Sequence, residues 1–358
     1  MKKRYQKAIF ALQKSVFYKY FNMDFKLTEE HIMIRDAARD FAKAELLPGV
    51  IERDEKQEFP KELVKKMGDL GFLGMMASPE YGGGGMDTIS YILVMEELSK
   101  IDASASVMVS VNNSLVCWGL DTFGNEEQKK KYLSKLTTGE KLGAFCLSEP
   151  EAGSDATSQR TTAIDKGDHY ILNGTKNWIT NGSSADYYLV IAQTDKEKKH
   201  KGINAFIVEK GTEGFEIGPK EQKLGIRGSD THSLNFNDVK VPKENRIGED
   251  GFGFKFAMKT LSGGRIGIAA QALGIASGAY ELAKDYSKQR KAFGTEICNH
   301  QAIAFKLADM YTSIEASRHM VMKAAWDKDQ GQNYDLSGAM AKLYASKTAM
   351  DVTVEAVQ

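Results

Sequence analysis

The chain has 358 residues, of which 42% are hydrophobic and 27% are charged, and its formal net charge is +0. This balance is typical of a globular protein built of two or three packed units. The lack of a basic excess argues against nucleic-acid binding, and because no apolar run approaches about 18 residues we expect no membrane span.

The cysteine and histidine patterns predict no metal site. Cys117, Cys146 and Cys298 are odd in number, far apart and without CxxC spacing. Disulfides and zinc are therefore not expected, and a reducing compartment fits this pattern. The histidines show no pair at metal-ligand spacing.

Residues 1–22 differ from the rest of the chain because they carry six Lys or Arg and no acid. They lack the continuous apolar centre of a secretory signal. We interpret them as a basic extension upstream of a true start at Met23, with a mitochondrial presequence as the alternative. Thr28 follows as a helix cap, with Glu29 and Glu30 in the first helical turn.

Residues 23–142 are predicted to form an N-terminal helical domain. Ile34, Ala38 and Phe41 recur at helical spacing, and the glycine run 82–85 breaks the pattern. That run is neither a dinucleotide-binding nor a P-loop fingerprint, so we interpret it as a loop.

Residues 143–245 change to a period of two and predict a middle β domain. The run "HYILNGTKNWITNG" predicts a hairpin that turns at Asn173-Gly174. "DYYLVIAQT" and "NAFIVEK" are predicted strands, and the charged run "DKEKKHK" between them is interpreted as a solvated turn. Since this segment has too few helices for a parallel sheet, we expect an antiparallel unit.

Residues 246–358 are predicted to form a C-terminal helical bundle, because three long helical segments are joined by short links. Gly267, Gly274 and Gly278 would let a neighbouring helix approach closely.

The run "FCLSEPEAGSD" at 145–155 has the composition of a ligand-binding loop. Hydroxyls lie on both sides of a bend that contains Pro150 and Gly153. This loop and the loop at 178–182 are expected to project from the β unit toward the helices, and ligand sites favour such domain junctions.

These residues resemble a known family. "LSEPEAGSD", "NWITNG", "KLGIRGS", "GGRIGIAAQALGIA", "QRKAFG" and "HQ" are similar to the signature runs of the acyl-CoA dehydrogenases, and most similar to those of short-chain, butyryl-CoA-type members. The likeness runs from Met23 to Gln358. It implies a mostly α, α+β fold with an N-terminal helical domain, a middle antiparallel β-barrel-like domain and a C-terminal four-helix bundle.

The resemblance also implies the residues of the site. The acyl-CoA contacts are implied at Ser154, Ser262 and Arg265, and no metal is implied. Arg290, Phe293 and Gln301 are implied to reach the FAD of a neighbouring subunit. The implied FAD contacts as a whole are Phe145, Leu147, Ser148, Gly153, Ser154, Trp178, Ile179, Thr180, Arg290, Phe293, Gln301 and Gln358.

The chemistry of a flavin agrees with these positions. A flat aromatic ring with polar edges needs an apolar plate such as Trp178 and short hydroxyl donors such as Thr180. An Arg fork such as Arg290 suits a pyrophosphate. Without the resemblance, Trp178 would be interpreted as a core residue and Arg290 as a favourable charge at a helix end.

Three positions depart from the family pattern. Ser148 stands where Thr is usual, which keeps a hydroxyl. Glu151 stands where Gly is frequent, and we expect its carboxylate to point to solvent. Ser262 stands where Asp is common.

The family's reaction needs a desolvated carboxylate base to remove the acyl α-proton. In most members this Glu lies in an I-Y-E-G-T run near the C-terminus, and in a minority it lies at the position of Gly264, which has no side chain. The catalytic Glu is therefore expected beyond Gln358, and we interpret the chain as C-terminally truncated. Residues 1–358 alone are expected to be inactive and to bind FAD poorly.

The sequence thus predicts FAD-dependent α,β-dehydrogenation of short-chain acyl-CoA thioesters to trans-2-enoyl-CoA, with electrons passed to electron-transferring flavoprotein. A homotetramer built of dimers is implied, in the bacterial cytoplasm or alternatively in the mitochondrial matrix. Two other readings stay open: a truncated or non-catalytic flavin-binding relative, and an acyl-CoA oxidase.

Overall fold

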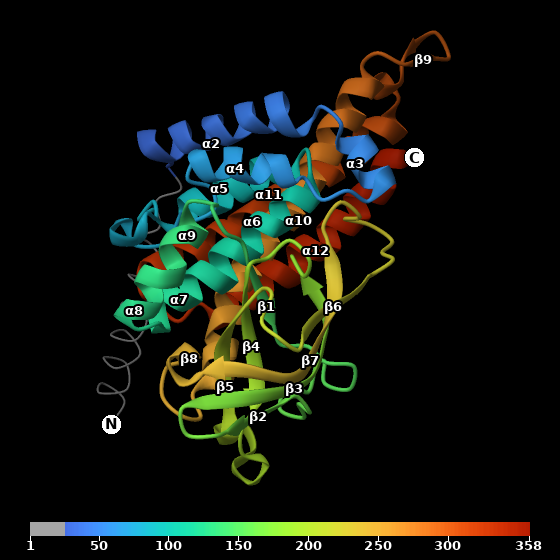
Figure 1. Cartoon of the computed structure of the whole chain (residues 1–358). Helices are drawn as coiled ribbons and strands as arrows, with labels where there is room; N and C mark the ends of the chain where they lie inside the picture. Colours follow the sequence, from blue (N-terminus) through green and yellow to red (C-terminus); the bar gives the residue numbers. More distant parts are fainter. Residues whose placement is uncertain (1–25) are drawn as a thin grey trace, which may run out of the picture.

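The computed structural model describes residues 26–358, so the predicted basic extension lies outside the described residues. Helices form the upper part of the molecule in Figure 1, and a β-sheet lies below them. The long helix α10 (Gly253–Ser287) runs from the sheet to the far end of the helical part.

The N-terminal part is helical, as predicted. Thr28 caps the first described helix: its Oγ1 accepts the His31 N–H at 3.2 Å, and the His31 ring accepts the Thr28 N–H at 3.2 Å. The helices are α2 (Glu29–Phe41), η1 (Ala42–Leu46), α3 (Val50–Lys56), α4 (Lys61–Asp69), η2 (Pro79–Tyr81), α5 (Thr88–Ser99), α6 (Ala103–Ser110), η3 (Val111–Cys117), α7 (Trp118–Phe123), α8 (Glu126–Gln128), η4 (Lys129–Leu133) and α9 (Ser134–Thr137).

The middle part is a single sheet with strand order β6-β7-β3-β2-β4-β5-β8, to which β1 adds beside β4. The strands are β1 (Gly143–Cys146), β2 (Thr162–Asp165), β3 (His169–Thr180), β4 (Tyr187–Gln193), β5 (Ile203–Glu209), β6 (Phe215–Lys220), β7 (Thr231–Pro242) and β8 (Arg246–Ile247), with short helices η5 (Lys196–Gly202) and η6 (Lys243–Asn245). Most pairings are antiparallel, as expected, but β4 pairs in parallel with β1 and with β2.

The hairpin predicted at Asn173-Gly174 is wrong. Both residues lie inside the continuous strand β3, where the register with β7 shifts between Leu172 and Gly174. Gly174 has φ +146, and a Cβ there would lie 2.5 Å from Thr161 Oγ1. The glycine therefore serves a β-bulge and a close approach of β3 to the neighbouring chain, not a turn.

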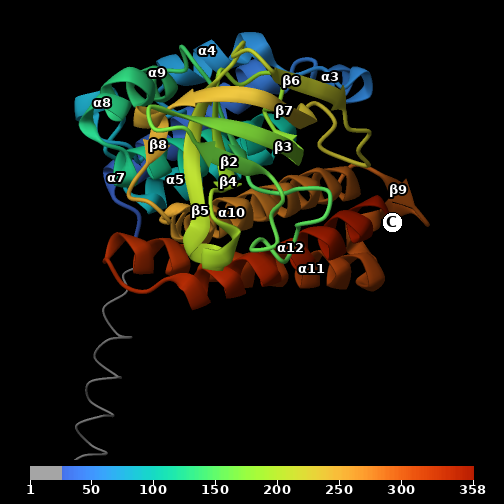
Figure 2. The ribbon, with the colours of Figure 1, turned by 60° about the horizontal axis from the view of Figure 1, so that its bottom comes forward.

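The C-terminal part contains three long helices, α10, α11 (Gln301–Asp329) and α12 (Asp335–Val357), which Figure 2 shows side by side, with α11 and α12 on the side of α10 away from the sheet. A hairpin of β9 (Lys291–Ala292) and β10 (Thr295–Glu296), followed by η7 (Ile297–Asn299), joins α10 to α11. Among residues 26–358, α10 is by length and composition long enough to cross a membrane, but 61% of its most apolar window is buried, which is typical of a core helix.

Three hydrophobic cores hold these parts together. The first joins α5 to the bundle, with Leu98, Leu273 and Val321 all buried. The second lies where the sheet meets η3, α7 and the first turns of α10. The third fills the other side of the sheet around Tyr170, Phe206 and Phe236. Phe145 and Leu147 of the first predicted loop pack in the second core, at the domain junction. The predicted loop 178–182 is partly wrong, because residues 178–180 end strand β3 and Ile179 lies in the third core.

Candidate functional site

The loop after β1 begins at this junction. Phe145, at the end of β1, is 8% exposed, and its ring centroid lies 6.3 Å from that of Phe256 on α10. Leu147 and Ser148 are half-buried, whereas Gly153 and Ser154 are exposed. Glu151 is exposed too and pairs with Arg160, so its expected orientation toward solvent is confirmed.

Trp178 projects from the sheet. The register between β3 and β7 shifts between Lys176 and Ile179, and Trp178 has φ +57 and is 61% exposed. The alternative interpretation of Trp178 as a core residue is therefore wrong. A left-handed backbone at a large side chain is uncommon, and such positions concentrate at functional sites.

The two residues that follow Trp178 differ in burial. Ile179 is 2% exposed and faces the sheet core, so its side chain does not line a site. Thr180 is half-buried. Of the predicted run 178–180, the structure presents the indole and leaves the Thr180 hydroxyl partly accessible.

Two hydrogen bonds from strand β3 anchor residues 147–148 of the loop. Asn177 N–H donates to the Ser148 carbonyl at 2.8 Å, and the Lys176 ammonium donates to the Leu147 carbonyl at 3.0 Å. The structure therefore brings the two predicted segments, 145–155 and 178–180, together. We call Phe145, Ser148, Trp178 and Thr180, with their neighbours Leu147, Gly153 and Ser154, the sheet-side cluster.

Sequence reasoning missed two residues beneath this cluster. Lys176 has a side chain 0% exposed, and its Nζ lies 2.7 Å from Glu149 Oε1, whose side chain is 3% exposed. Burial tends to raise the pKa of the Glu149 carboxyl, but Lys176 and the backbone donors at Arg160 and Thr161 outweigh it and hold that pKa below its ordinary value. The alternation of β3 carried no signal that a lysine would occupy a core position.

The predicted substrate residues lie on α10. Arg265 is exposed and donates to Ser262 Oγ at 3.4 Å. Gly264 is buried, and a Cβ there would lie 2.8 Å from Leu115 Cδ2. The inner face of α10 at this turn is therefore in close contact with η3.

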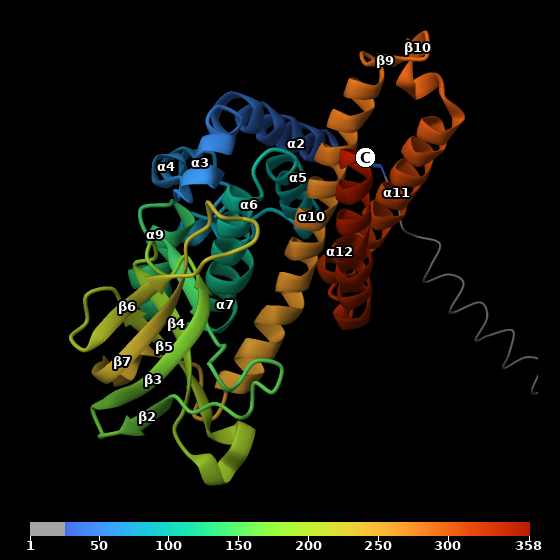
Figure 3. The same cartoon turned by 90° about the vertical axis from the view of Figure 1, so that its right-hand side faces the viewer.

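The remaining predicted residues gather at another place. Arg290 and Gln301 flank the segment of the β9–β10 hairpin and η7, and Phe293 lies in the hairpin turn, where it is 97% exposed with φ +54. Gln358 lines a cavity of about 500 Å³ together with Tyr286 and Ile297 at the same end of the bundle. We call Arg290, Phe293, Gln301 and Gln358 the tip cluster. Figure 3 shows the hairpin at the end of the bundle away from the sheet, so one chain does not bring the two clusters together.

The sheet-side cluster fits a flavin. Among the described residues, the Ser148 and Thr180 hydroxyls and the Trp178 indole N–H have no hydrogen-bond partner in the protein. An exposed aromatic plate beside available short donors matches a flat ring with polar edges. Within residues 26–358 no group of three or more His, Cys, Asp or Glu side chains could hold a metal ion, and Cys117, Cys146 and Cys298 are all free thiols.

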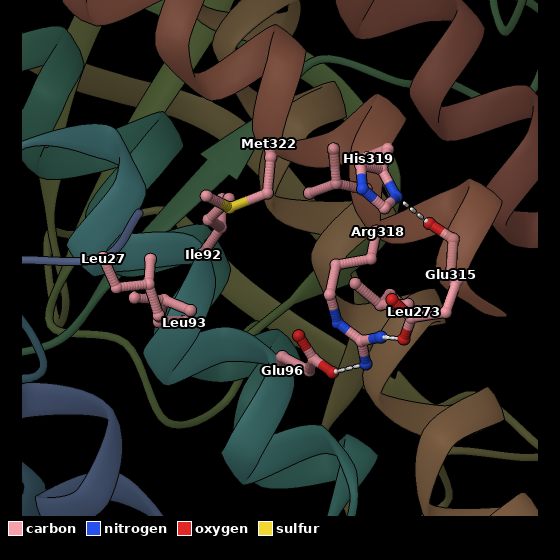
Figure 4. Close-up of a pocket in the computed structure, with 10 residues that line it drawn as sticks. Leu27, Ile92, Leu93, Glu96, Leu273, Glu315, Arg318, His319 and Met322 are labelled. Carbon is pink, nitrogen blue, oxygen red and sulfur yellow. Dashed lines mark hydrogen bonds and ion pairs between the residues drawn. The ribbon is translucent and has the colours of Figure 1, made fainter. Parts of the chain in front are cut away.

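A separate cavity of about 160 Å³ lies between α5, α10 and α11 (Figure 4). Its polar side chains are paired within the protein: Arg318 Nη2 donates to Glu96 Oε1 at 2.6 Å, Arg318 also pairs with Glu315, and the His319 ring bonds the backbone carbonyl of Glu315 at 2.7 Å. The rest of the lining is mainly apolar, for example Leu27, Ile92 and Met322. This cavity contains none of the predicted site residues.

Three family models match the chain in order. Residues 28–140 match the acyl-CoA dehydrogenase N-terminal domain, residues 144–239 the middle domain and residues 251–358 the C-terminal domain. The fold and the site thus define a flavoprotein oxidoreductase. The chain belongs to the acyl-CoA dehydrogenase family, whose members are FAD flavoproteins.

Curated relatives support this membership. The chain is 52% identical over 336 residues to a short-chain specific acyl-CoA dehydrogenase of Clostridium acetobutylicum, covering 94% of this chain and 89% of the relative. It is 46% identical over 333 residues to the mitochondrial short-chain specific acyl-CoA dehydrogenase of Mus musculus, covering 93% and 81%.

Solved structures agree with the fold. The butyryl-CoA dehydrogenase of Megasphaera elsdenii superposes with a TM-score of 0.92 at 51% identity, covering 94% of this chain and 89% of that chain. A chain from a structure described as an electron transferring flavoprotein of Acidaminococcus fermentans gives 0.93 at 52% identity, covering 94% and 88%. PigA with FAD and proline gives 0.90 at 31% identity, covering 94% and 88%.

Proposed function

We propose that this protein dehydrogenates short-chain acyl-CoA thioesters, of about four carbons, to trans-2-enoyl-CoA and passes the electrons to electron-transferring flavoprotein. Bound FAD supplies the acceptor for the hydride equivalent that leaves the β-carbon. Trp178 would cover the flavin ring, and the Ser148 and Thr180 hydroxyls would donate to its polar edge, where reduction places negative charge. The α-proton would pass to a desolvated carboxylate base, a role for which Gly264 has no side chain.

One observation of the structure carries the short-chain substrate. The Tyr91 hydroxyl donates to Ser110 Oγ at 3.1 Å, and a Cβ at Gly267 would lie 2.3 Å from that hydroxyl oxygen. Gly267 is one turn beyond Gly264 on the same helix, a rise of about 4.5 Å. Tyr91 is 1% exposed, so it fills the space between α5 and α10 at this point.

About one turn further along α10, a second polar contact joins this helix to α6. Gln271 is 5% exposed, and its Nε2 donates to the Ala103 carbonyl at 2.9 Å and to Ser106 Oγ at 3.0 Å. An acyl chain that enters beside Gly264 would therefore meet Tyr91 after roughly one helical turn. A rise of about 4.5 Å is comparable to the length of a butyryl chain, which supports a short-chain substrate.

The direct test uses the purified protein. The purified protein is expected to be yellow, and anaerobic addition of butyryl-CoA is expected to bleach it. Turnover should be faster with electron-transferring flavoprotein than with oxygen as acceptor. A colourless protein that stays so with added FAD would contradict the proposal, and rapid oxygen consumption would favour an oxidase.

Tyr91 gives a sharper test of substrate length. The variant Tyr91→Ala removes the ring that packs against Gly267, so the ratio of kcat/KM for octanoyl-CoA to that for butyryl-CoA should rise roughly 10-fold or more. The control Tyr91→Phe removes only the hydroxyl that bonds Ser110 and should leave the ratio near the wild-type value. An unchanged ratio in Tyr91→Ala would show that the acyl chain does not end at Tyr91.

We further propose a homotetramer in the cytoplasm of a bacterium. Several large side chains on the outer faces of the bundle helices are exposed, including Phe305, Leu336, Leu343 and Val357, which supports association through this part of the molecule. The similarity to the Clostridium acetobutylicum enzyme supports the bacterial location. The mitochondrial matrix is the alternative, since the mouse relative is mitochondrial.

A further inference from the structure

A buried ion pair lies directly beneath the sheet-side cluster. Lys176, with a fully buried side chain, donates from Nζ to Glu149 Oε1 at 2.7 Å, to the Leu147 carbonyl at 3.0 Å and to Gln159 Oε1 at 3.2 Å. Replacing a buried ion pair by apolar side chains is often neutral or stabilising. Stability alone therefore does not explain why Lys176 and Glu149 occupy these positions.

Backbone N–H groups also bind the Glu149 carboxylate. Its Oε2 accepts the Arg160 N–H at 2.6 Å, and its Oε1 accepts the Thr161 N–H at 3.1 Å. Its own N–H donates to the Ala152 carbonyl at 3.0 Å, and the Ala152 N–H donates back at 3.2 Å. The pair therefore joins three segments: the loop 147–152, the segment 159–161 and strand β3.

The contact with the Leu147 carbonyl bears on the next residue. The Leu147 carbonyl and the Ser148 N–H belong to one peptide group, so a cation at the oxygen withdraws electron density from the N–H. Hydrogen bonds in a chain strengthen one another in this way. The Ser148 carbonyl is held separately by the Asn177 N–H at 2.8 Å, so the Ser148 peptide units are anchored on both sides from β3.

We propose that Lys176 and Glu149 are positioning residues for the flavin: they hold the Ser148 segment against the ring, and the Lys176 cation strengthens the Ser148 N–H as a donor to the reduced flavin. This inference rests on the proposed placement of the flavin at the sheet-side cluster. Since the stronger donor favours the form with more negative charge, the cation raises the reduction potential of the bound FAD.

Removing the two charges one at a time is expected to affect the midpoint potential of bound FAD differently. Lys176→Met keeps the length of the side chain and removes the cation, so the reduced form of FAD should lose about tenfold in relative affinity, a shift of about −30 mV in the midpoint potential. Glu149→Gln keeps the ammonium and removes the nearby negative charge, so the potential should stay or move positive. A loop that is merely distorted would move the potential in the same direction in both variants.

The experiment uses the FAD-loaded protein, and it measures the midpoint potential of bound FAD, the FAD dissociation constant and the thermal midpoint. Lys240→Met, the same substitution at an exposed lysine of β7, is the matched control and should equal the wild type in all three. The double variant Lys176→Met with Glu149→Met removes the uncompensated charge. It should regain thermal stability but keep the more negative potential.

Three outcomes would overturn the proposal: a wild-type potential in Lys176→Met, a shift of the same sign in both single variants, or recovery of the potential together with stability in the double variant. If Lys176→Met does not fold, Glu149→Gln and the double variant still decide the question. Wild-type protein that binds FAD but is not reduced by butyryl-CoA would refute the proposed substrate, and the potentials of the variants would remain a test of the ion pair.

Discussion

Single residues at the site adopt backbone conformations that cost free energy. Trp178 in β3 and Phe293 in the β9–β10 turn both have positive φ, and both side chains are exposed, at 61% and 97%. Phe293 and Gly294 are the two central residues of a tight hairpin turn, where Asn or Gly is the usual choice at the first position. A large apolar side chain at each of these positions is therefore better explained by contact with a ligand or a partner subunit than by folding.

Lys328 on α11 shows how one buried charge sets a pH dependence. Its Nζ lies 3.5 Å from Met76 Sδ and 5.4 Å from the ring centroid of Trp118. Burial lowers the pKa of the Lys328 ammonium to about 8, and Asp329 opposes this only in part. The pKa of Lys328 in the folded state lies below its unfolded value of 10.5. Lys328 therefore lowers the free energy of unfolding by its full amount below pH 8, and this cost disappears as the pH rises toward 10.5.

We therefore expect Lys328→Met to raise the free energy of unfolding at pH 7 by roughly 1–3 kcal/mol, a range that allows for the partial exposure of the side chain and the lost contact with Trp118. The gain should shrink between pH 8 and pH 10.5. Urea unfolding at three pH values measures it. Lys259→Met, an exposed lysine 5.7 Å from the Phe123 ring centroid, should show no gain. A gain that is the same at every pH would contradict this explanation.

At the scale of elements, the close contact between α5 and α10 follows from glycines that the sequence pattern identifies. A Cβ at Gly274 would lie 2.4 Å from the Glu96 carbonyl oxygen, and one at Gly278 would lie 2.4 Å from the Lys100 carbonyl oxygen, so the predicted close approach is confirmed. Helical period and small residues are local properties, and they predict such a contact well. They do not show which helix makes it.

Other elements show where sequence patterns fail. Asn173-Gly174 is a strong turn signal, but the same dipeptide also suits a bulge, and only the pairing of β3 with β7 decides between them. The sheet-side residues were predictable because their motif is local, whereas Lys176 and Glu149 were not, because their burial depends on three separate segments. The contact of Tyr91 with Gly267 was likewise unpredictable, since the two residues lie far apart in the sequence.

Alanine substitutions at two glycines of α10 are expected to change the stability of the protein in opposite directions. Gly274→Ala places a Cβ against a backbone carbonyl that cannot move aside, so we expect a loss of about 1–3 kcal/mol in stability. At Gly263 nothing is closer to the added Cβ than Lys328 Nζ at 3.9 Å, so Gly263→Ala should stabilise by about 0.4–1 kcal/mol. Urea midpoints of the two variants provide the comparison. Equal effects would mean that helix propensity, not close packing, decides at both positions.

At the scale of the whole molecule, the two clusters of predicted FAD residues lie toward opposite ends of α10. Phe145 lies near Phe256 in the first turn of this helix, and Arg290 follows its last residue beside the β9–β10 hairpin (Figure 3). The sheet-side cluster lies where the sheet meets the first turns of α10, and the tip cluster lies where α10, α11 and the end of α12 meet. A single FAD that contacts both clusters therefore needs two subunits, the second of which turns its tip toward the sheet of the first.

This arrangement predicts complementation between two inactive variants. Ser148→Trp fills the sheet-side cluster, and Arg290→Glu places an acid where a pyrophosphate is expected, so each variant alone should bind FAD poorly. In a mixed dimer, one site would combine both defects and the other would combine an intact sheet-side cluster with an intact tip. Since half of the dimers formed on equal co-expression are mixed, about a quarter of the wild-type flavin content and activity should return. The measurement is flavin absorbance and butyryl-CoA turnover of the co-expressed protein beside each variant alone. No recovery is expected when every chain carries both substitutions, because both sites of each dimer are then defective. If the co-expressed variants stay as poor as each alone, the two clusters do not share a flavin across subunits, and the tip cluster has another role.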